Sequence, residues 1–366
     1  MKPFFSIIVP CCNVGQYIHE CLESIQNQSF ERWECLCIIE DSTDNTETIV
    51  HEYADKDSRF KVFTQPRSGS VSKPRNCGME NAIGEYIIFC DGDDSITEAS
   101  LARIAMKVSE HPGADIYPCA IWEYRDGGDY IRTIDNFMME HPVELSGHDA
   151  ALLLYKYWRN PSPMLQGNVW RRDFLKKNNL QCIPGLVYED SEFFPRALYL
   201  AKRIVPIHEP IYLYRRHKAS VTVMPHEPGF ENKHWAMILK SLFAFYVKET
   251  KKPGFDKHIA KCWARLWIDL LYHYWFGQKA VKTVPRQKRR ETLKLLFADG
   301  FGPLHLLAAN TTLARRSLIF LVQLYLLCPL LALPIEQFFL KIAFPLTRIK
   351  NRNKQESNHE HGKQQV

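Results

Sequence analysis

The sequence lacks the cysteine spacing of a zinc site or of a disulfide framework. Its 366 residues contain 11 cysteines, an odd number, and no two of them are spaced Cys-x-x-Cys. Several lie in apolar, strand-like runs, where a free thiol behaves as a small buried hydrophobic group. These are Cys11, Cys12, Cys35, Cys37 and Cys90. The pattern argues against a disulfide-stapled scaffold and favours a reducing compartment.

The sequence also has no secretory leader pattern, no internal repeat and no glycine-rich phosphate loop. The first residues are apolar but soon become polar, without a small-residue cleavage site. We therefore expect residues 4–9 to form a first strand and not a signal peptide. The segment 10–13 that follows contains no glycine, and the first glycine is Gly15. That composition counts against a loop that cradles phosphate with glycine amides.

Positive charge is concentrated near the C-terminal end. The whole chain has a net charge of +6, but residues 279–354 alone contain 14 Lys or Arg against three acidic residues, which leaves a slightly acidic body. Such asymmetry indicates an anionic surface as a partner. The basic residues are interleaved with Leu, Ile and Phe, a pattern that favours a membrane over nucleic acid.

Two apolar stretches, 317–335 and 338–346, lie within this basic region. The first is borderline in length for a transmembrane helix, which needs about 20 apolar residues. Basic residues stand on both sides of it, which does not suit a simple span, because cationic loops prefer the cytoplasmic face. An in-plane anchor or re-entrant hairpin on an anionic leaflet fits better, with a spanning helix and a buried core helix as alternatives.

The first 120 residues alternate short apolar runs with helical patterns, which is typical of βαβ units and a largely parallel sheet. The spacing predicts a helix over 16–28 and another over 98–109, with Thr97 as its N-cap. Between 122 and 165 the pattern weakens, which predicts a variable excursion. The expected strands are 4–9, 34–39, 60–64, 85–90 and 115–121.

Three carboxylates, Asp91, Asp93 and Asp94, follow the strand expected over 85–90. In open α/β sheets, ligands bind outside the carboxyl ends of strands. Clustered aspartates there can hold a hard cation such as Mg²⁺ or Mn²⁺, which prefers oxygen ligands and would carry a phosphorylated substrate. An acidic turn is the alternative, because Asp and Gly are ordinary loop formers.

The ends of the other expected strands add polar groups to the same edge of the sheet. Asn13 follows the first strand, Asp41 and Asp44 follow the second, and Arg75 comes soon after the third. Carboxylates for an ion and cations for phosphate oxygens suit a metal–diphosphate. Asp41 and Asp44 have a simpler alternative as caps of a helix over 45–53, which is the better interpretation for Asp44 taken alone.

In their order and spacing, these segments resemble glycosyltransferase family 2, whose members are inverting, nucleotide-sugar-dependent enzymes of the GT-A fold. The resemblance is close over residues 4–96 and looser at Trp170, 188–193 and 210–215. The segments are Ile7-Ile8-Val9-Pro10-x-x-Asn13, Glu40-Asp41-Ser42-Thr43-Asp44, Arg75-Asn76-x-Gly78, Gly84-Glu85-Tyr86-Ile87-x-Phe89-x-Asp91-x-Asp93-Asp94, Tyr188-Glu189-Asp190-x-Glu192-Phe193 and Pro210-x-Tyr212-x-Tyr214-Arg215.

The resemblance implies a donor site at the strand ends. Pro10 and Asn13 would line the nucleobase and ribose pocket, Asp41 would accept a hydrogen bond from a uracil ring, and Arg75 would lie along the donor. The sequence departs from the family at Cys12, where an aromatic residue is usual. The usual Asp-Asp-Gly-Ser segment appears here as Glu40-Asp41-Ser42. The glycine after Asp41 is therefore missing, and the nucleobase loop is shorter.

The resemblance also implies the chemical groups. Asp93 would bind the metal directly, and Asp91 would lie nearer the ribose and the metal shell. Glu189 and Asp190 match the family's Glu-Asp pair, whose Asp is the catalytic base; a helix cap is the simpler interpretation of Asp190. Inversion independently requires a base on the face opposite the leaving diphosphate. His217 is expected near the acceptor side, either at the site or in solvent.

The expected function is transfer of a sugar, from a UDP-sugar above all, to a hydroxyl of a cell-surface glycan or lipid-linked acceptor. We expect the protein in the cytoplasm, at the inner face of the membrane, without a nucleic-acid partner. The alternatives are a sugar-phosphate nucleotidyltransferase and a basic-tailed binding protein with a degenerate transferase fold. The expected domains are 1–225 (catalytic, with a nucleotide-sugar half to about 120 and an acceptor half beyond), 226–300 (helical), 301–350 (membrane-associating) and 351–366 (disordered).

Aromatic residues recur near the end of the helical extension, at Trp263, Trp267, Tyr272, Tyr274 and Trp275. Their spacings suit a helix that packs on the catalytic domain, a sugar-binding platform or part of a membrane belt, and helix packing is the commonest of the three. The sequence alone does not decide among the three.

Overall fold

The computed structural model describes residues 2–126, 129–134, 144–157, 164–218, 220, 226–276 and 278–296. The chain divides into two compact units, Met1–Pro225 and His226–Val366. The apolar stretches expected at 317–335 and 338–346, and the tail 351–366, lie outside the described residues. No helix in the described part of the chain combines the length and the apolar character needed to cross a membrane.

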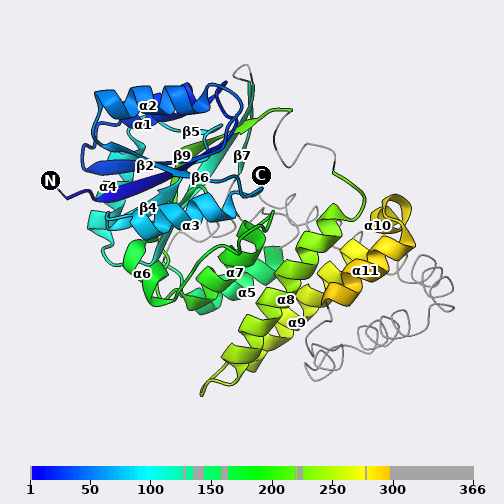
Figure 1. Ribbon diagram of the computed structural model, residues 1–366. Helices are drawn as coiled ribbons and strands as arrows, with labels where there is room; N and C mark the ends of the chain where they lie inside the picture. The colour runs from blue at the N-terminus through cyan, green and yellow to red at the C-terminus, as the bar shows by residue number, and fades with distance from the viewer. Residues whose placement is uncertain are drawn as a thin grey trace, which may run out of the picture. The chain divides into compact units, whose positions relative to one another are not determined.

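Unit 1 is built on one sheet in which, among the described residues, nine strands run in the order β3-β2-β1-β4-β8-β6-β9-β5, with β7 paired to β6. The first four of these are all parallel, and β6 also runs parallel to β9 (Figure 1). The strands are β1 (Phe5–Cys11), β2 (Trp33–Glu40), β3 (Phe60–Gln65), β4 (Tyr86–Phe89), β5 (Ser95–Ile96), β6 (Ile116–Arg125), β7 (Tyr130–Ile134), β8 (Asn168–Arg171) and β9 (Ile207–Arg216).

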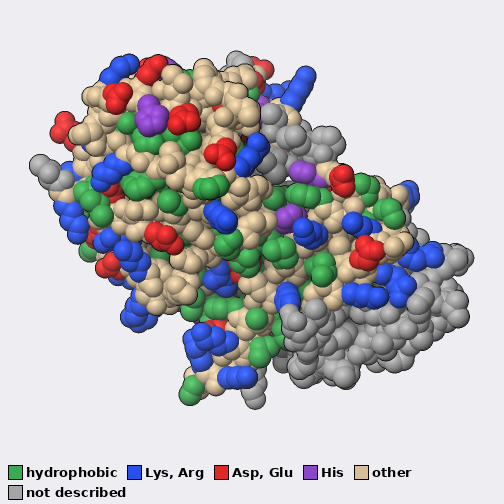
Figure 2. Space-filling view, viewed as in Figure 1, with side chains coloured by type: hydrophobic (Ala, Val, Ile, Leu, Met, Phe, Trp, Pro, Cys, Tyr) green, Lys and Arg blue, Asp and Glu red, His purple; other side chains and the backbone are tan. Residues whose placement is uncertain are grey.

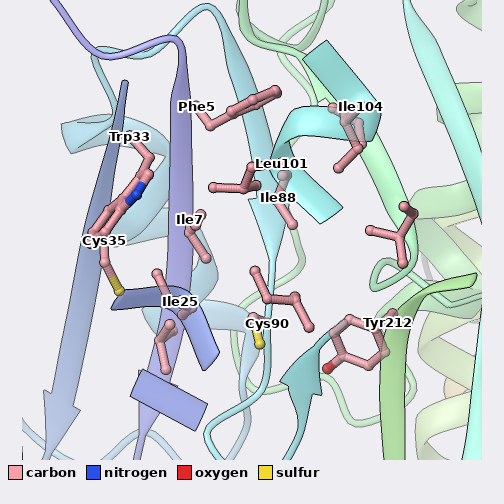
Figure 3. Packing of buried hydrophobic residues seen from close by; sticks show 14 of the residues in the cluster. Phe5, Ile7, Ile25, Trp33, Cys35, Ile88, Cys90, Leu101, Ile104 and Tyr212 are labelled. Carbon is pink, nitrogen blue, oxygen red and sulfur yellow. The ribbon is translucent and has the colours of Figure 1, made fainter. Parts of the chain in front are cut away.

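Helices cover both faces of the parallel strands, which explains why β1 and β2 are continuous apolar runs. In β1, Ile7 and Val9 point into a core shared with α1 (Ile18–Gln26), α2 (Thr46–Lys56) and α4 (Ser100–Glu110). Ile8 points into a second core, shared with α3 (Ser72–Asn81). Figure 3 shows the first core, in which Phe5, Ile7 and Ile88 pack between Trp33 and Tyr212.

The predicted α/β fold is confirmed, and each of the five predicted strands is present with ends shifted by a few residues. The predicted N-cap at Thr97 is wrong. Ala99, with a φ of 57°, precedes α4, while the Thr97 hydroxyl donates to the Pro210 carbonyl over 2.9 Å. Thr97 is therefore used to join α4 to β9, because a tertiary partner competes with the local cap.

The described parts of 122–165 contain regular elements although the sequence pattern there is weak. They contain the end of β6, the strand β7 and the helix α5 (Gly147–Tyr157). After it, β8 inserts antiparallel between β4 and β6, and α6 (Arg172–Lys177) and α7 (Asp190–Leu200) follow. The insertion of β8 beside β4 places the second half of unit 1 next to the end of β4, where the acidic residues lie.

The turn after β4 can approach β1 only because residue 92 is glycine. A Cβ atom on Gly92 would lie 2.9 Å from the Val14 Cγ2 and 3.0 Å from the Pro10 carbonyl oxygen. Both distances are shorter than ordinary van der Waals contact. Gly92 thus lets the acidic turn pack directly against the segment that the sequence places at the nucleobase pocket.

Unit 2 is helical and contains α8 (Phe230–Thr250), α9 (Lys257–Leu271), a π-helical turn (Tyr272–Phe276), α10 (Gln278–Thr283) and α11 (Arg286–Leu296). Its tryptophans form a core: Trp263 stacks on Tyr246 with ring centroids 3.4 Å apart, and Trp275 is fully buried. The Trp267 indole donates to the Leu239 carbonyl over 3.1 Å. These tryptophans therefore pack within unit 2, and the predicted packing on the catalytic domain stays a prediction.

Candidate active site

Asp91, Asp93 and Asp94 come together in the turn after β4, and their carboxylate oxygens lie within 4.8 Å of one another. Asp91 and Asp93 are partly exposed, whereas Asp94 is buried. Removal from water, together with repulsion from Asp93 and Asp91, raises the pKa of Asp94 well above its usual value. A cation at the two exposed carboxylates would offset this repulsion.

Asp94 has a structural role in this cluster. Its Oδ2 accepts a hydrogen bond from the Tyr212 hydroxyl over 2.5 Å, and its Oδ1 accepts one from the Arg215 backbone amide over 2.7 Å. The Tyr212 hydroxyl also accepts from the Asp91 backbone amide over 3.1 Å. β9 therefore holds the acidic turn in place from its buried side.

Asp93 presents its side chain to His217, which directly follows the end of β9. The His217 Nε2 lies 2.9 Å from the Asp93 Oδ2. The His217 ring is nearly buried and lies against Tyr17, with ring centroids 4.6 Å apart, and its Nδ1 has no hydrogen-bond partner among the described residues. Of the two interpretations of His217, the structure supports the one at the site.

Asp91 is held by two side chains from elsewhere in the fold. Its Oδ1 accepts a hydrogen bond from the Arg75 Nη2 over 2.7 Å, and its Oδ2 accepts one from the Gln166 amide. Arg75 lies on α3, and Gln166 lies just before β8. Nothing in the sequence singled out Gln166, because its position depends on the insertion of β8 beside β4.

Arg75 connects the acidic turn to α7. Its guanidinium is buried between Asp91 and Glu189, and the Nη1 donates to the Glu189 Oε1. The Glu189 carboxylate is buried as well; loss of hydration raises its pKa, although the positive charge of Arg75 opposes that shift. Three charged side chains from β4, α3 and the start of α7 thus form one network.

Asp190 is the first residue of α7 and is less buried than Glu189. Its Oδ1 accepts a hydrogen bond from the Ser191 amide over 2.6 Å. Desolvation and the adjacent Glu189 carboxylate together raise the pKa of Asp190 to about 8. A carboxyl group with this pKa can take up a proton near neutral pH, which a helix cap alone does not require.

On the side of β1 and β2, the strand ends are joined by polar contacts. The Asn13 side-chain oxygen accepts a hydrogen bond from the Thr43 amide over 2.8 Å, and the exposed Asp41 accepts one from the Arg67 amide over 3.3 Å. Asp44 accepts from the Thr46 and Gly15 amides at 3.1 Å and 2.8 Å. Asp44 therefore stabilises the start of α2, as its simpler interpretation predicted.

The structure thus joins Asp91, Arg75 and Glu189 in one bonded network, with Asp93 beside Asp91 in the acidic turn and Asp190 next to Glu189 in the chain. Pro10, Asn13 and Asp41 lie at the neighbouring strand ends, with Pro10 buried against the glycine of the acidic turn. The ten described cysteines form no disulfide. Cys12 is half-buried, whereas Cys11, Cys35, Cys37 and Cys90 are buried. The candidate site thus combines the carboxylates of the turn after β4 with a second carboxylate pair at the start of α7.

The chain belongs to glycosyl transferase family 2. The model of that family matches residues 6–177. An uncharacterized glycosyltransferase of Haemophilus influenzae is 38% identical over 226 residues, which cover 60% of this chain and 82% of the relative. The uncharacterized glycosyltransferase EpsJ of Bacillus subtilis is 29% identical over 255 residues, which cover 67% of this chain and 70% of that protein. The protein is therefore a glycosyltransferase.

Solved structures agree with this fold. Residues 1–349 of TarS from Staphylococcus aureus, in complex with UDP-GlcNAc, are similar with a TM-score of 0.59 and 21% identity, over 89% of this chain and 91% of that one. The complex of the same protein with UDP has a TM-score of 0.61 and 22% identity. At this level of identity the comparison establishes the GT-A fold and carries no residue roles.

Proposed function

We propose that the protein transfers a sugar from a UDP-sugar to a hydroxyl of a cell-surface glycan or lipid-linked acceptor, with inversion at the anomeric carbon. The observation that carries the proposal is the network through Arg75, which joins Asp91 in the acidic turn to Glu189 beside Asp190. This network places carboxylates suited to a donor diphosphate next to a carboxyl group suited to act as a base. Residues 1–225 are proposed as the catalytic domain and 226–300 as a helical extension.

The acidic turn fits a divalent cation such as Mg²⁺ or Mn²⁺. Asp93 and Asp91 would hold the ion, because they are the two partly exposed carboxylates of the cluster. Burial, together with repulsion from Asp93 and Asp91, raises the pKa of Asp94, and a cation at the turn would reduce that repulsion. A bound cation would neutralise charge on the departing diphosphate. Asp94, bonded to Tyr212, would keep the turn rigid and would not bind the ion.

Asp190 is proposed as the base that removes the proton from the acceptor hydroxyl. It is partly exposed, and its Oδ2 has no hydrogen-bond partner among the described residues, whereas Glu189 is committed to Arg75. Its pKa of about 8 places proton uptake in the working range of a general base. Glu189 would position Arg75, which would lie along the donor.

The proposed donor class rests on the strand ends and on the neighbours. Pro10, Asn13 and Asp41 lie at the ends of β1 and β2, with Asp41 exposed and so free to meet a nucleobase. TarS, the similar protein above, was solved with UDP and with UDP-GlcNAc. Calorimetric titration of the full chain with UDP tests the proposal. We expect binding that strengthens when Mn²⁺ is added, and no binding of UDP under either condition would contradict the donor class.

The proposed acceptor is a cell-surface glycan or a lipid-linked saccharide at an anionic membrane. TarS of Staphylococcus aureus, 29% identical over 231 residues that cover 61% of this chain and 38% of that protein, is named a poly(ribitol-phosphate) beta-N-acetylglucosaminyltransferase. In unit 2, α11 buries Leu293 and Leu296 and exposes Arg286, Lys288 and Lys294. Figure 2 shows Lys and Arg side chains gathered over this part of the chain. Lys and Arg side chains near a membrane surface are attracted to its anionic lipids.

Sedimentation with vesicles tests the membrane proposal. The full chain is expected to bind vesicles that contain phosphatidylglycerol, less strongly as salt is raised. Replacement of Arg286, Lys288 and Lys294 by Gln is expected to weaken this binding. Equal binding to neutral phosphatidylcholine vesicles, or no binding to either kind, would contradict the proposed peripheral association.

A further inference from the structure

The β6–β7 hairpin and the adjacent end of β9 carry two arginines bonded to one buried carboxylate. Glu123 is 3% exposed, and its Oε1 accepts from the Arg216 Nη1 over 3.0 Å while its Oε2 accepts from the Arg132 Nε over 2.5 Å. Arg132 and Arg216 are 64% and 55% exposed. Because Glu123 fixes one edge of each guanidinium, the other N–H groups of both remain at the surface. Figure 1 shows β6, β7 and β9 running together.

Arg125 adds a third charge to the same surface, which we call the arginine face (Arg125, Arg132 and Arg216). Arg125 is the direct register partner of Arg216 in the parallel pair β6–β9, so the two side chains share a face of the sheet. Like charges directly opposite each other on neighbouring strands are destabilising. No described carboxylate pairs with Arg125, and the nearby Asp126 pairs with Arg215 instead.

Among the described residues, Glu123 is the one carboxylate bonded to these three guanidiniums, so the face keeps positive charge that an anion would offset. Guanidinium groups bind phosphate through parallel N–H···O bonds, and a carboxylate behind them fixes their orientation. Two of the three cations are anchored in this way by Glu123. The chemistry of the face therefore fits a phosphate group better than a neutral sugar.

The arginine face lies at the same end of β9 as the candidate active site but on the opposite face of the sheet, because neighbouring residues of a strand point to opposite faces. Arg216 is directly followed by His217, whose Nε2 lies 2.9 Å from the Asp93 Oδ2. Arg215, on the other side of Arg216 in sequence, donates from its Nε to the Asp93 carbonyl over 3.0 Å. A molecule bound to the face would therefore have to pass round the end of β9 to reach the acidic turn.

We propose that the arginine face binds a phosphate group of the acceptor. The inference rests on the proposed function, since it presumes an acceptor that reaches the site from this side. The phosphate is either a phosphodiester of an anionic polymer or the diphosphate of a lipid-linked saccharide. Both sources offer the same oxygens to the guanidiniums of Arg132 and Arg216.

Binding of two phosphate ligands to the full chain tests the proposal. UDP and Mn²⁺ are present at saturation, so that the donor site is filled, and the probes are a fluorescent poly(ribitol phosphate) oligomer and farnesyl diphosphate. The double substitution Arg132→Gln with Arg216→Gln is expected to weaken binding of at least one probe by about tenfold or more, since hydrogen bonds to charged groups are worth about 1.5–3 kcal/mol each. Arg103→Gln, at an exposed position on α4, is the matched control and should leave binding unchanged.

The outcomes distinguish the two sources of the phosphate group, and they test the arginine face separately from the donor class. A loss for the polymer alone identifies a phosphodiester, and a loss for the prenyl diphosphate alone identifies a lipid-linked acceptor. Arg125→Gln is expected to weaken binding as well. Because this substitution breaks no ion pair, it tests the proposal even if the double variant does not fold. If neither probe binds, or if every arginine variant binds like the wild type, the inference is overturned. UDP binding, measured in the same samples, decides the donor class independently.

Discussion

Arg75 on α3 is bonded to Glu189, which lies 114 residues further along the chain at the start of α7. Both side chains are almost fully buried, and the same guanidinium also bonds Asp91 over 2.7 Å. The pair thus joins the half of unit 1 that contains the acidic turn to the half that contains Asp190. Its integrity is central to the geometry of the proposed active site.

Removal of Arg75 is expected to cost stability as well as activity. Arg75→Ala leaves the Glu189 and Asp91 carboxylates without their cation, and breaking a buried pair from one side costs about 3–5 kcal/mol. Urea unfolding monitored by circular dichroism measures this loss. Lys73→Ala, at an exposed position on the same helix, is the control. A loss for Arg75→Ala no larger than that for Lys73→Ala would show that the network contributes little.

The activity is expected to depend on ionisation of Asp190. Because the base acts in its ionised form and its pKa is about 8, kcat/KM should rise with pH and level off above about 8. Asp190→Asn should lower kcat by about 10²–10⁴, the usual contribution of a general base. Asp173→Asn, at a residue 80% exposed on α6, is the control. A pH profile that is the same in wild type and Asp190→Asn would argue against Asp190 as the base.

The same carboxyl group is expected to make the fold less stable at alkaline pH. Its ordinary pKa is 3.8, and in the folded protein it is about 8. Between these values the folded chain holds a proton that the unfolded chain has lost, so the free energy of unfolding falls as pH rises and is constant above about 8. Asp190→Asn should remove this contribution and raise Tm at pH 9, by about 2–4 °C for each kcal/mol that the ionised carboxylate costs the fold.

Differential scanning calorimetry at pH 5 and pH 9 measures that effect. The wild type and Asp190→Asn should differ more at pH 9 than at pH 5, because the cost of the ionised carboxylate is present only at the higher pH. Equal differences at the two pH values would mean that the asparagine acts through packing and not through charge.

Tyr212 is expected to control the shape of the acidic turn without binding a ligand. Tyr212→Phe removes the partner of the Asp94 carboxylate and of the Asp91 amide, and an unsatisfied buried group costs about 1–3 kcal/mol. Mn²⁺ binding, measured by electron paramagnetic resonance, should weaken along with stability. Tyr53→Phe, which loses only an exposed bond to the His19 carbonyl, should change neither. Unchanged Mn²⁺ affinity in Tyr212→Phe would argue against this positioning role.

The half of the site formed by β1 to β4 could be predicted from the sequence, because each apolar run ends at its own polar group. Asp91, Asp93 and Asn13 were identified in this way. The remaining half depends on pairing between distant segments. Gln166 is 75 residues from its partner Asp91, and its place follows from the antiparallel insertion of β8. No local pattern marks such a residue.

Two other features show the same limit. Thr97 has the composition of a helix cap, yet it bonds β9, because a tertiary partner outweighs the local one. Asp94 follows Asp93 directly in the sequence, and only the long-range contact with Tyr212 shows that its carboxylate is buried and bonded within the fold. Local chemistry therefore identified the type of site, and long-range contacts decided which of its residues are available to a ligand.

Turnover of nucleotide sugars tests the central claim most directly. The full chain is incubated with UDP-sugars in the presence of Mn²⁺ and after chelation by EDTA, and release of UDP is measured for the wild type, Asp93→Asn and Asp173→Asn. We predict release from at least one donor with Mn²⁺, loss of release with EDTA or in Asp93→Asn, and no effect of Asp173→Asn. UDP release that is unaffected by both EDTA and Asp93→Asn, or no release from any donor, would contradict the account.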